Sequence, residues 1–350
     1  MGDYSRNIIR ATYTIRQALE SLNKLGSKTN LTLFVLDESE KLIATLTDGD
    51  IRRALLAGIG LDDGIQDIMH REFRALEASD IDVLKIKSFR EQEIELIPVL
   101  DREGRITQIL DLDTVVSILP VDGVIMAGGK GKRLGSLTAE TPKPLLQVGD
   151  KTILEHGIDR MHKYGINNVY LSLNHFADKI KAHCGDGSSY GVNINYIVEE
   201  QALGTIGSVT LVDEFPNDYI LVMNSDLLTN INLEDMFLAL QVNNADMAVA
   251  SIPYKVKVPY ATFDLDENNV RSLREKPTYT YYSNGGIYLF KKELLSFLPK
   301  GQLFNATDLM NSVVEAGGKL ISFPILGYWL DIGRPEDYEK AQQDIKYLKL

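Results

Sequence analysis

The sequence predicts an α/β protein, with a mainly parallel sheet in its larger C-terminal part and a small duplicated module in front. In the front part, a Val-Leu-Asp motif at residue 35 returns 64 residues later at residue 99, which indicates an internal duplication. In the larger part, strand-like and helix-like segments alternate, an order typical of parallel strands joined by covering helices. Its apolar strand-like runs lie at about 121–126, 168–173, 192–198 and 219–223.

The composition limits the class of protein. A chain of 350 residues with 44% apolar side chains is long enough for two or three domains, and its net charge of −12 disfavours nucleic-acid binding. No apolar stretch approaches the roughly 18 to 20 residues of a membrane span, and residues 1–10 lack the apolar core of a signal peptide. We therefore expect a cytoplasmic protein with no membrane partner. Cys184 is the single cysteine and is expected to be structural.

Each copy of the duplication consists of two short strands followed by a helix pattern. In the first copy the strands are predicted at 31–36 and 41–46 and the helix at 48–57. In the second copy the helix pattern ends at Leu119. Because Pro120 interrupts that pattern and a new apolar run follows, we place the domain boundary there, between residues 1–119 and 120–350.

The tandem arrangement resembles a CBS-domain pair, or Bateman module, with copies at about 8–62 and 63–119. In that family, a Thr and an Asp after the second strand commonly hold the ribose and phosphate of an adenosine nucleotide, and Thr47 and Asp50 match them. The second copy lacks the hydroxyl at the first position, so the resemblance implies at most one intact nucleotide site. Helix capping by Thr47 is the alternative explanation, because Thr and Asp are common at helix N-termini.

A glycine-rich loop follows the first strand of the larger part. Its sequence over residues 127–134 is Ala-Gly-Gly-Lys-Gly-Lys-Arg-Leu; the glycines let backbone N–H groups approach a polyanion, and Lys132 and Arg133 add charge. A Walker A loop is excluded because Arg133 stands where Ser or Thr is required. A dinucleotide-binding fingerprint fits badly because Leu134 replaces its third glycine. Downstream, two prolines flank Lys143 and fix it in an extended segment suited to presenting one cation.

The loop and the Pro-Lys-Pro-Leu segment resemble the signature of sugar-1-phosphate nucleotidyltransferases, and further motifs of that family follow in the expected order. The resemblance covers about residues 121–347 and implies a Rossmann-like (GT-A-like) domain with a mixed, mainly parallel sheet over residues 120–350. Ile206 departs from the family pattern, which usually has alanine there. The further motifs are Leu-Gly-Thr-Ile-Gly at 203–207, Asn-Ser-Asp at 224–226, Glu-Lys-Pro at 275–277, Asn-Gly-Gly-Ile-Tyr at 284–288 and Trp-Leu-Asp-Ile-Gly at 329–333.

The resemblance also implies a reaction and a role for these residues. In the family, an oxygen of a sugar-1-phosphate attacks the α-phosphorus of a nucleoside triphosphate and pyrophosphate leaves, so the protein acts mainly by neutralising charge. The candidate catalytic residues are Asp226 and Asp331, which would hold Mg²⁺, Arg133 for the β- and γ-phosphates, and Lys143 for the α-phosphate region. The nucleotide is assigned to Ala127, Gly128, Gly129, Gly131, Lys132, Arg133, Lys143, Asn174 and Glu199. The sugar phosphate is assigned to Gly204, Glu275, Lys276, Asn284 and Gly285.

Neither the base nor the sugar follows from these residues. The backbone at Ala127 and Gly128, with Asn174 and Glu199, provides the family-like base positions, and none of them distinguishes guanine from uracil. A tandem CBS pair ahead of this catalytic domain resembles, more narrowly, the glucosamine-1-phosphate guanylyltransferases of legionaminic acid biosynthesis, which implies GTP and glucosamine-1-phosphate. The alternatives are a mannose-1-phosphate guanylyltransferase and another uridylyl or thymidylyl sugar-phosphate transferase.

Two other classes of protein compete with the enzyme. A non-catalytic regulatory subunit or nucleotide sensor can share the fold, but the charged residues named for catalysis are all present here. A glycosyltransferase can also look similar, but it often has an Asp-x-Asp pair where this chain has Asn-Ser-Asp at 224–226. For the front module we expect either an adenine nucleotide that regulates activity or a role in assembly. We expect a homo-oligomer, because CBS pairs often stack face to face.

Overall fold

The computed structural model describes residues 4–26, 31–79 and 81–348. The chain divides into two compact units, Met1–Ile118 and Leu119–Leu350, one residue from the predicted domain boundary. Of the polar N-terminal segment considered above, residues 1–3 lie outside the described residues. Within the described ranges, no helix is both long and apolar enough to cross a membrane.

The first unit is built twice on the same plan. Each half contains a three-stranded sheet whose first two strands pair in parallel and whose last two pair antiparallel. The pairing shifts after Val35 in the first half and after Val99 in the second, so the irregularity is repeated too. The two halves therefore share one strand arrangement, which is what an internal duplication would give. The elements are β1 (Ile8–Arg10), α1 (Ile15–Leu25), β2 (Thr32–Leu36), β3 (Leu42–Thr47), α2 (Asp48–Leu56), β4 (Leu76–Glu77), α3 (Val83–Glu91), β5 (Leu96–Leu100) and β6 (Ile106–Asp111).

The prediction of a helix at the end of the second copy is wrong. Residues 112–119 form turns and irregular chain, with one turn closed by the N–H groups of Thr114 and Val115 on the Asp111 carbonyl at 3.1 and 2.9 Å. Pro120 disfavours a helical conformation in the residue before it. The turn at residues 111–115 therefore does not continue as a helix, although the apolar spacing of the segment resembles one.

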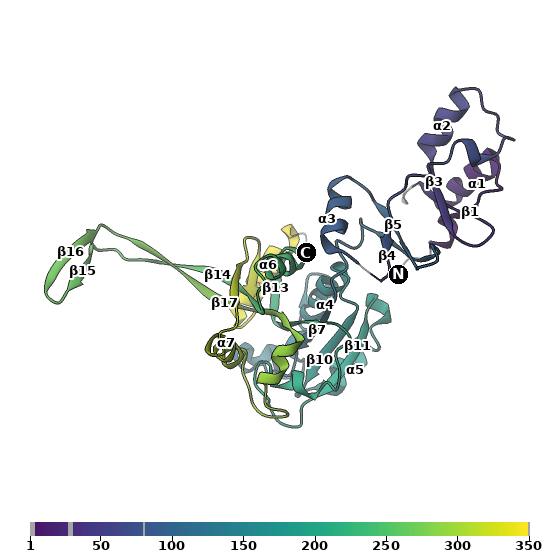
Figure 1. The fold of residues 1–350 in the computed structure, drawn as a ribbon. Coiled ribbons are helices and arrows are strands. Elements are labelled where there is room, and N and C mark those ends of the chain that lie inside the picture. Colours follow the sequence, from purple (N-terminus) through teal and green to yellow (C-terminus); the bar gives the residue numbers. More distant parts are fainter. Residues whose placement is uncertain (1–3, 27–30, 80, 349–350) are drawn as a thin grey trace. The chain divides into compact units, whose positions relative to one another are not determined.

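A seven-stranded sheet in the order β11-β10-β7-β12-β17-β14-β18 forms the centre of the second unit (Figure 1). Neighbouring strands are parallel except at β17, which runs antiparallel to β12 and β14. The prediction of a mixed, mainly parallel sheet is confirmed. Its strands are β7 (Val121–Met126), β10 (Asn168–Leu173), β11 (Asn193–Val198), β12 (Tyr219–Asn224), β14 (Met247–Lys257), β17 (Thr278–Lys291) and β18 (Leu320–Pro324). The α-helices of this unit are α4 (Ile153–Lys163), α5 (Ala177–Cys184), α6 (Leu233–Val242), α7 (Ala306–Glu315) and α8 (Pro335–Asp344).

The core of the second unit lies where the middle strands meet the helices. Val222 of β12 and Phe290 of β17 are fully buried in one cluster with Leu309 of α7. Burying each such side chain stabilises the fold by about 1.5 to 3 kcal/mol relative to leaving it in water. Cys184, at the end of α5, is also buried, and burial raises the pKa of its thiol to about 12. It therefore stays protonated, as a structural residue should.

The sheet order brings two separate segments of the chain to one edge. β7 and β12 are parallel neighbours, and Asn224 at the end of β12 pairs with Met126 at the end of β7. The glycine-rich loop after β7 and residues 224–226 after β12 therefore leave the sheet side by side. Beyond them, the short strands β13 (Leu227–Thr229) and β19 (Trp329–Asp331) form an antiparallel pair.

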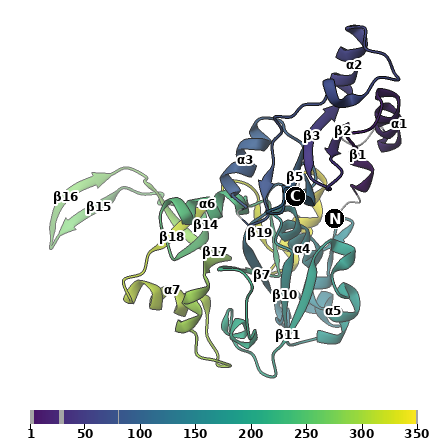
Figure 2. The ribbon, with the colours of Figure 1, turned by 45° about the vertical axis from the view of Figure 1, so that its right-hand side comes forward.

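Two strands of the central sheet continue outward as an arm, which we define as residues 252–283. β14 and β17 stay paired without interruption from Ser251 opposite Asn284 to Lys257 opposite Thr278. Figures 1 and 2 show the arm leaving the rest of this unit. Its tip is a hairpin of β15 (Thr262–Asp266) and β16 (Asn269–Arg274).

Candidate active site

The glycine-rich loop passes close to Lys143 on its way from β7 into the short helix η3 (Lys132–Thr138). Gly131 adopts φ +62°, and its carbonyl accepts a hydrogen bond from Thr138 Oγ1 at 2.9 Å. A Cβ at Gly131 would lie 3.1 Å from Lys143 Cβ, tighter than an ordinary contact. Glycine is therefore required here both by the left-handed backbone and by the lysine behind it.

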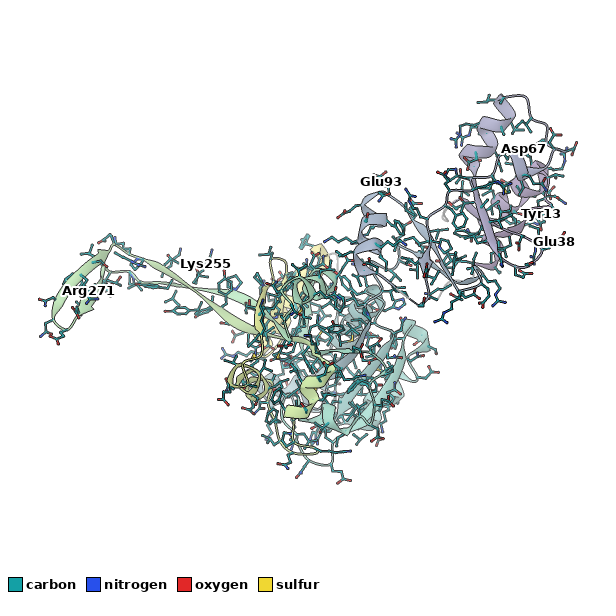
Figure 3. All side chains as sticks on the ribbon, viewed as in Figure 1. Tyr13, Glu38, Asp67, Glu93, Lys255 and Arg271 are labelled. Atoms are coloured by element: carbon teal, nitrogen blue, oxygen red, sulfur yellow. The ribbon has the colours of Figure 1, made fainter. Side chains whose placement is uncertain are left out.

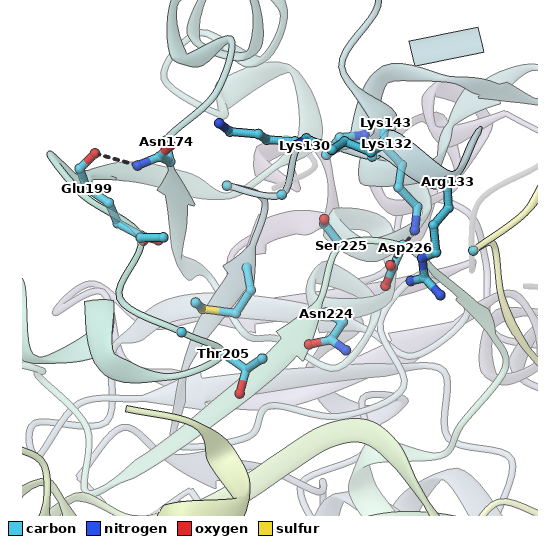
Figure 4. A pocket seen from close by; sticks show the side chains of 18 residues that line it. Lys130, Lys132, Arg133, Lys143, Asn174, Glu199, Thr205, Asn224, Ser225 and Asp226 are labelled. Atoms are coloured by element: carbon cyan, nitrogen blue, oxygen red, sulfur yellow. Dashed lines mark hydrogen bonds and ion pairs between the residues drawn. The ribbon is translucent and has the colours of Figure 1, made fainter. Parts of the chain in front are cut away.

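The loop borders a cleft of about 490 Å³ (Figure 4). Lys130, Lys132 and Arg133 are exposed cations of the loop, and they lie on one side of the cleft with Lys143. A polyanion entering the cleft would meet these four charges together. The cleft brings together ten of the predicted site residues: Gly128, Gly129, Gly131, Lys132, Arg133, Lys143, Asn174, Glu199, Gly204 and Asp226.

Lys143 is a buried cation between two prolines, but the prediction of an extended segment is wrong, because Lys143–Leu145 form a short 3-10 helix. Pro142 has φ −59° and ψ 140°, the extended conformation, and its carbonyl accepts from Leu145 N at 2.8 Å. Lys143 is only 8% exposed. Its Nζ lies 2.5 Å from Asp226 Oδ2 and 4.0 Å from Asp331 Oδ1. A buried ammonium needs such partners, because an unpaired charge out of water is very costly.

The two aspartates come together through strand pairing. Asp331 ends β19 and pairs with Leu227 of β13, the residue that follows Asp226. Ile332 N then donates to the Asp226 carbonyl at 2.9 Å. Residues more than a hundred positions apart in the sequence are thus fixed as backbone neighbours, and Asp331 lies beside the lined cleft next to Lys143.

The aspartate pair has the chemistry of a site for a hard divalent cation. The Oδ1 atoms of Asp226 and Asp331 are both buried and have no hydrogen-bond partner. Burial, and then the charge of Asp226, raise the pKa of Asp331, whereas Lys143 and Arg133 act in the opposite direction. The described residues contain no cluster of three or more His, Cys, Asp or Glu side chains that could hold a metal. Mg²⁺ would therefore take its remaining ligands from phosphate oxygens and water, as it commonly does.

Glu199, Asn174 and Gly128 form another wall of the cleft. Glu199 is buried, with Oε1 accepting from Ser172 Oγ at 2.6 Å and Oε2 accepting from Leu203 N at 2.9 Å. Asn174 Nδ2 donates to the Glu199 carbonyl at 2.9 Å. A Cβ at Gly128 would lie 3.2 Å from Asn174 Cβ and 3.4 Å from Glu199 Oε1, so the missing side chain leaves this wall open to a ligand.

Ala127 lies behind that wall rather than in it. The residue is 1% exposed, and its N–H donates to the Ser172 carbonyl at 2.8 Å, which continues the pairing of the sheet. Gly204 does line the cleft and has φ +82°. A Cβ there would lie 2.5 Å from the Phe304 carbonyl oxygen, so no other residue fits without moving the backbone.

The remaining predicted sugar-phosphate residues are not among those that line the cleft. Asn284 and Gly285 lie at the root of the arm, where Asn284 Nδ2 donates to Tyr288 Oη at 2.9 Å and the Gly285 carbonyl accepts from Trp329 Nε1 at 2.9 Å. Glu275 and Lys276 lie farther out, between β16 and β17, and both are exposed. Their assigned roles stay predictions.

Thr47 and Asp50 belong to the first unit and form a helix cap. Asp50 Oδ2 accepts from Thr47 N at 2.9 Å and from Thr47 Oγ1 at 2.7 Å, at the start of α2. The capping alternative is therefore realised. Thr47 also lines a second cleft of about 450 Å³ within the first unit, whereas Asp50 is not among its lining residues.

Eight residues that line the main cleft are not among the predicted ones. Most lie inside or beside the motifs, so their positions are detectable even though their roles are not. Lys130 carries the clearest signal, because it is a cation between two glycines of the glycine-rich loop. The eight are Met126, Lys130, Pro144, Ala202, Thr205, Asn224, Ser225 and Gly333.

The second unit has relatives among known proteins. Residues 122–347 match the family model described as nucleotidyl transferase. A mannose-1-phosphate guanylyltransferase of Mycobacterium tuberculosis is 29% identical over 233 residues, which cover 64% of this chain and 64% of that protein. A D-glycero-alpha-D-manno-heptose 1-phosphate guanylyltransferase of Aneurinibacillus thermoaerophilus is 28% identical over 229 residues, covering 65% and 99%. The crystal structure of HddC from Yersinia pseudotuberculosis complexed with GMP-PN has 25% identity and a TM-score of 0.50, covering 64% of this chain and 99% of that one.

Replacing Asp331 with Asn should raise the melting temperature of the protein in the absence of divalent cations. Because the pKa of Asp331 is raised, the folded state binds that proton more tightly than the unfolded state does. Stability is therefore lost as the pH rises from the ordinary aspartate pKa through the raised one, and the neutral Asn removes this loss. Calorimetry in EDTA should give Asp331→Asn a higher Tm than the wild type at pH 7, and equal values once the pH is low enough to protonate Asp331.

The exposed Asp213 provides a matched control in the same unit. Asp213→Asn should leave the Tm within the error of the wild type at both pH values. A lower Tm for Asp331→Asn at pH 7 would show that the two carboxylates are not in electrostatic conflict.

Proposed function

The chain belongs to the nucleotidyl transferase family, and we propose that it transfers a nucleotidyl group from a nucleoside triphosphate to a sugar-1-phosphate in the cytoplasm, releasing pyrophosphate. The expectation of an enzyme of this class is confirmed at the level of the family. One observation carries the proposed reaction: four cations around the cleft meet a pair of carboxylates that each retain a buried oxygen without a hydrogen bond.

The proposed chemistry is an in-line displacement at phosphorus. A sugar-phosphate oxygen forms a bond to the α-phosphorus while the bond to the bridging β-phosphate oxygen breaks, and pyrophosphate leaves with that electron pair. Arg133 can contact the β- and γ-phosphates with paired N–H groups, and its exposed position leaves it available. Lys143, fixed beside Asp226, offsets the charge of the α-phosphate. Mg²⁺ held by Asp226 and Asp331 would neutralise phosphate charge in the same region.

GTP is the proposed nucleotide. Guanine presents neighbouring N1–H and N2–H donors, and a carboxylate accepts such donors; Glu199 retains further lone pairs after its two internal hydrogen bonds. Uracil and thymine offer a single N–H between two carbonyls, which suits a carboxylate less well. The names of two relatives, both guanylyltransferases, and the GMP-PN in the HddC crystal structure support the same choice.

Glucosamine-1-phosphate is the proposed sugar, on the resemblance of the whole chain to the guanylyltransferases of legionaminic acid biosynthesis. The relatives named above act on other sugars by their names, mannose-1-phosphate and a heptose 1-phosphate. Another relative, from Synechocystis, is named as a UTP–glucose-1-phosphate uridylyltransferase. These four sugar phosphates therefore define the set that an assay must compare.

A matrix of nucleoside triphosphates against these sugar-1-phosphates, with Mg²⁺ and pyrophosphate release as the readout, tests the proposed activity. GTP with glucosamine-1-phosphate should give the highest kcat/KM. Arg133→Ala should lower it at least about 100-fold, because the charge developing on the leaving pyrophosphate loses its main partner. The exposed Lys300→Ala variant, from the same unit, should retain full activity.

Absence of pyrophosphate with every pair, from a protein that is folded by circular dichroism, would favour the non-catalytic sensor. If Arg133→Ala retains full activity, the protein is still a transferase, but the proposed contact of Arg133 with the β- and γ-phosphates is refuted.

We also propose that the first unit binds an adenine nucleotide that regulates the enzyme. Its cleft is lined by aromatic Phe34 and Phe73, by Arg74 and by Thr47, which together can stack on a base, pair with a phosphate and hydrogen-bond a ribose. His70 lines the same cleft. This set is more complete than the Thr47 and Asp50 pair alone, because Asp50 is committed to the helix cap.

Adding AMP, ADP or ATP to the assay should change the apparent affinity for substrate. A coupling free energy of about 1 to 3 kcal/mol, the usual allosteric range, corresponds to roughly a 5- to 150-fold change. Arg74→Ala should abolish both the effect and the heat of nucleotide binding in calorimetry, whereas Arg102→Ala, an exposed arginine of the same unit, should preserve both. If no adenine nucleotide binds the wild type, the first unit is an assembly device instead.

A further inference from the structure

The arm, residues 252–283, carries an apolar face that the rest of its chain leaves exposed. In the tip hairpin, Phe263 pairs with Leu273 and Leu265 pairs with Val270, so the four side chains share one face of the hairpin. All four are more than half exposed. On the paired ribbon between the tip and the central sheet, Tyr254 pairs with Tyr281, and both are exposed. Figure 3 shows side chains standing out along the whole arm, with Lys255 and Arg271 labelled.

Such a face needs a partner. An isolated two-stranded hairpin is marginally stable in water, and a continuous exposed apolar patch of this kind marks an interaction surface. The charge of the arm differs from the charge of the rest of the chain. Over residues 252–283 there are five Lys or Arg and four Asp or Glu, whereas the whole chain carries 37 and 49. The arm is thus slightly basic and the remainder of the chain is strongly acidic, so a second copy of this chain is an electrostatically suitable partner.

The root of the arm lies at the cleft. Gly286, at the bulge where the arm begins, has φ +73°, and a Cβ there would lie 2.7 Å from Nδ2 of the cleft residue Asn224. The neighbouring Gly285 carbonyl is bonded to Trp329 of β19, the strand that ends in Asp331. If each arm docks on a second copy near the root of that copy's arm, two-fold symmetry brings each arm to the cleft of the other copy.

No Lys or Arg lines the cleft at residues 202–205 and 224–225. The four Lys and Arg residues of the cleft all come from the loop and the Pro-Lys-Pro segment, between residues 130 and 143. A sugar-1-phosphate brings a second phosphate to the same cleft, and the two phosphates repel each other. A cation in addition to these four residues and Mg²⁺ would reduce that repulsion.

The arm carries a suitable cation but holds it away from its own cleft. Lys276 is exposed, and its φ of +42° is unusual for a residue with a side chain, so it interrupts the strand between β16 and β17. It lies two residues before the paired, extended strand that runs from Thr278 to Asn284, and those six residues of strand alone span about 20 Å at 3.3 Å per residue. While the ribbon stays paired, Lys276 cannot return to the cleft at its own root.

We propose that two copies of this chain exchange arms, and that Lys276 of each arm, beside Glu275, contacts the sugar phosphate in the cleft of the other copy. The proposal rests on the proposed transferase function for the role of Lys276, and on the exposed apolar face for the exchange itself. Each active site is then composed of the loop and aspartates of one copy and the arm of its partner.

Mixing two inactive variants tests the composite site. Lys276→Ala damages only the arm and Asp226→Ala damages only the cleft. After coexpression at equal levels, half of the dimers are mixed, and each mixed dimer has one cleft with an intact arm, so about a quarter of the wild-type activity should return. If each arm serves its own cleft, the mixture will show no more than the sum of the two variants, and the exchange is refuted.

A second experiment is independent of activity. Lys276→Cys and Thr205→Cys, placed on separate chains and oxidised after mixing, should form a disulfide-linked dimer only in the mixture, since the native Cys184 is buried. Phe263→Asp should abolish that dimer and reduce the mass by light scattering from about twice 39.1 kDa to one chain. If the wild type is inactive but these results hold, the transferase function fails and the exchange stands. A wild type that is monomeric at micromolar concentration overturns the exchange, even if it is an active transferase.

Discussion

The site depends on one electrostatic constraint, the forced proximity of two carboxylates. Asp226 and Asp331 each keep a buried oxygen without a hydrogen bond, and Lys143 and Arg133 offset only part of their charge. In the absence of a cation, the burial of Asp331 and then the charge of Asp226 raise the pKa of Asp331, which opposes folding above that pKa. With a divalent cation and phosphates present, the same charges would become ligands, and the lost stability would be the cost of a preformed binding site.

The rest of the second unit holds that pair in place. Parallel pairing of β7 with β12 brings the glycine-rich loop beside residues 224–226. Antiparallel pairing of β13 with β19 then places Asp331 next to Asp226. The buried Arg160 of α4 holds β13 in place, because its Nη2 donates to the Thr229 carbonyl at 2.7 Å. The pair is therefore fixed by backbone hydrogen bonds at both strands, which limits how far the carboxylates can separate to relieve their repulsion.

The sequence predicts those parts of the structure that follow from local chemistry. Glycines, prolines and motif order locate the loop, Lys143 and the two aspartates, because each of these positions requires a particular residue type. The helix predicted before Pro120 is absent, which shows that apolar spacing alone is not sufficient evidence for a helix. Proline disfavours a helical conformation in the residue before it. The position of Lys276 away from the cleft could not be predicted from the sequence, for a different reason. Motif order does not say whether β14 and β17 end at the edge of the sheet or continue past it as an arm.

Cation binding is the direct test of the central claim. Mn²⁺ can replace Mg²⁺ at carboxylate and phosphate oxygens and is visible by electron paramagnetic resonance. Titrated into the wild type with a non-hydrolysable GTP analogue, Mn²⁺ should bind at least about tenfold more tightly than it does to Asp226→Asn with the same analogue, because that variant has lost a ligand. Equal affinity for the two proteins would mean that the nucleotide alone holds the cation and that the aspartates are paired for some other reason.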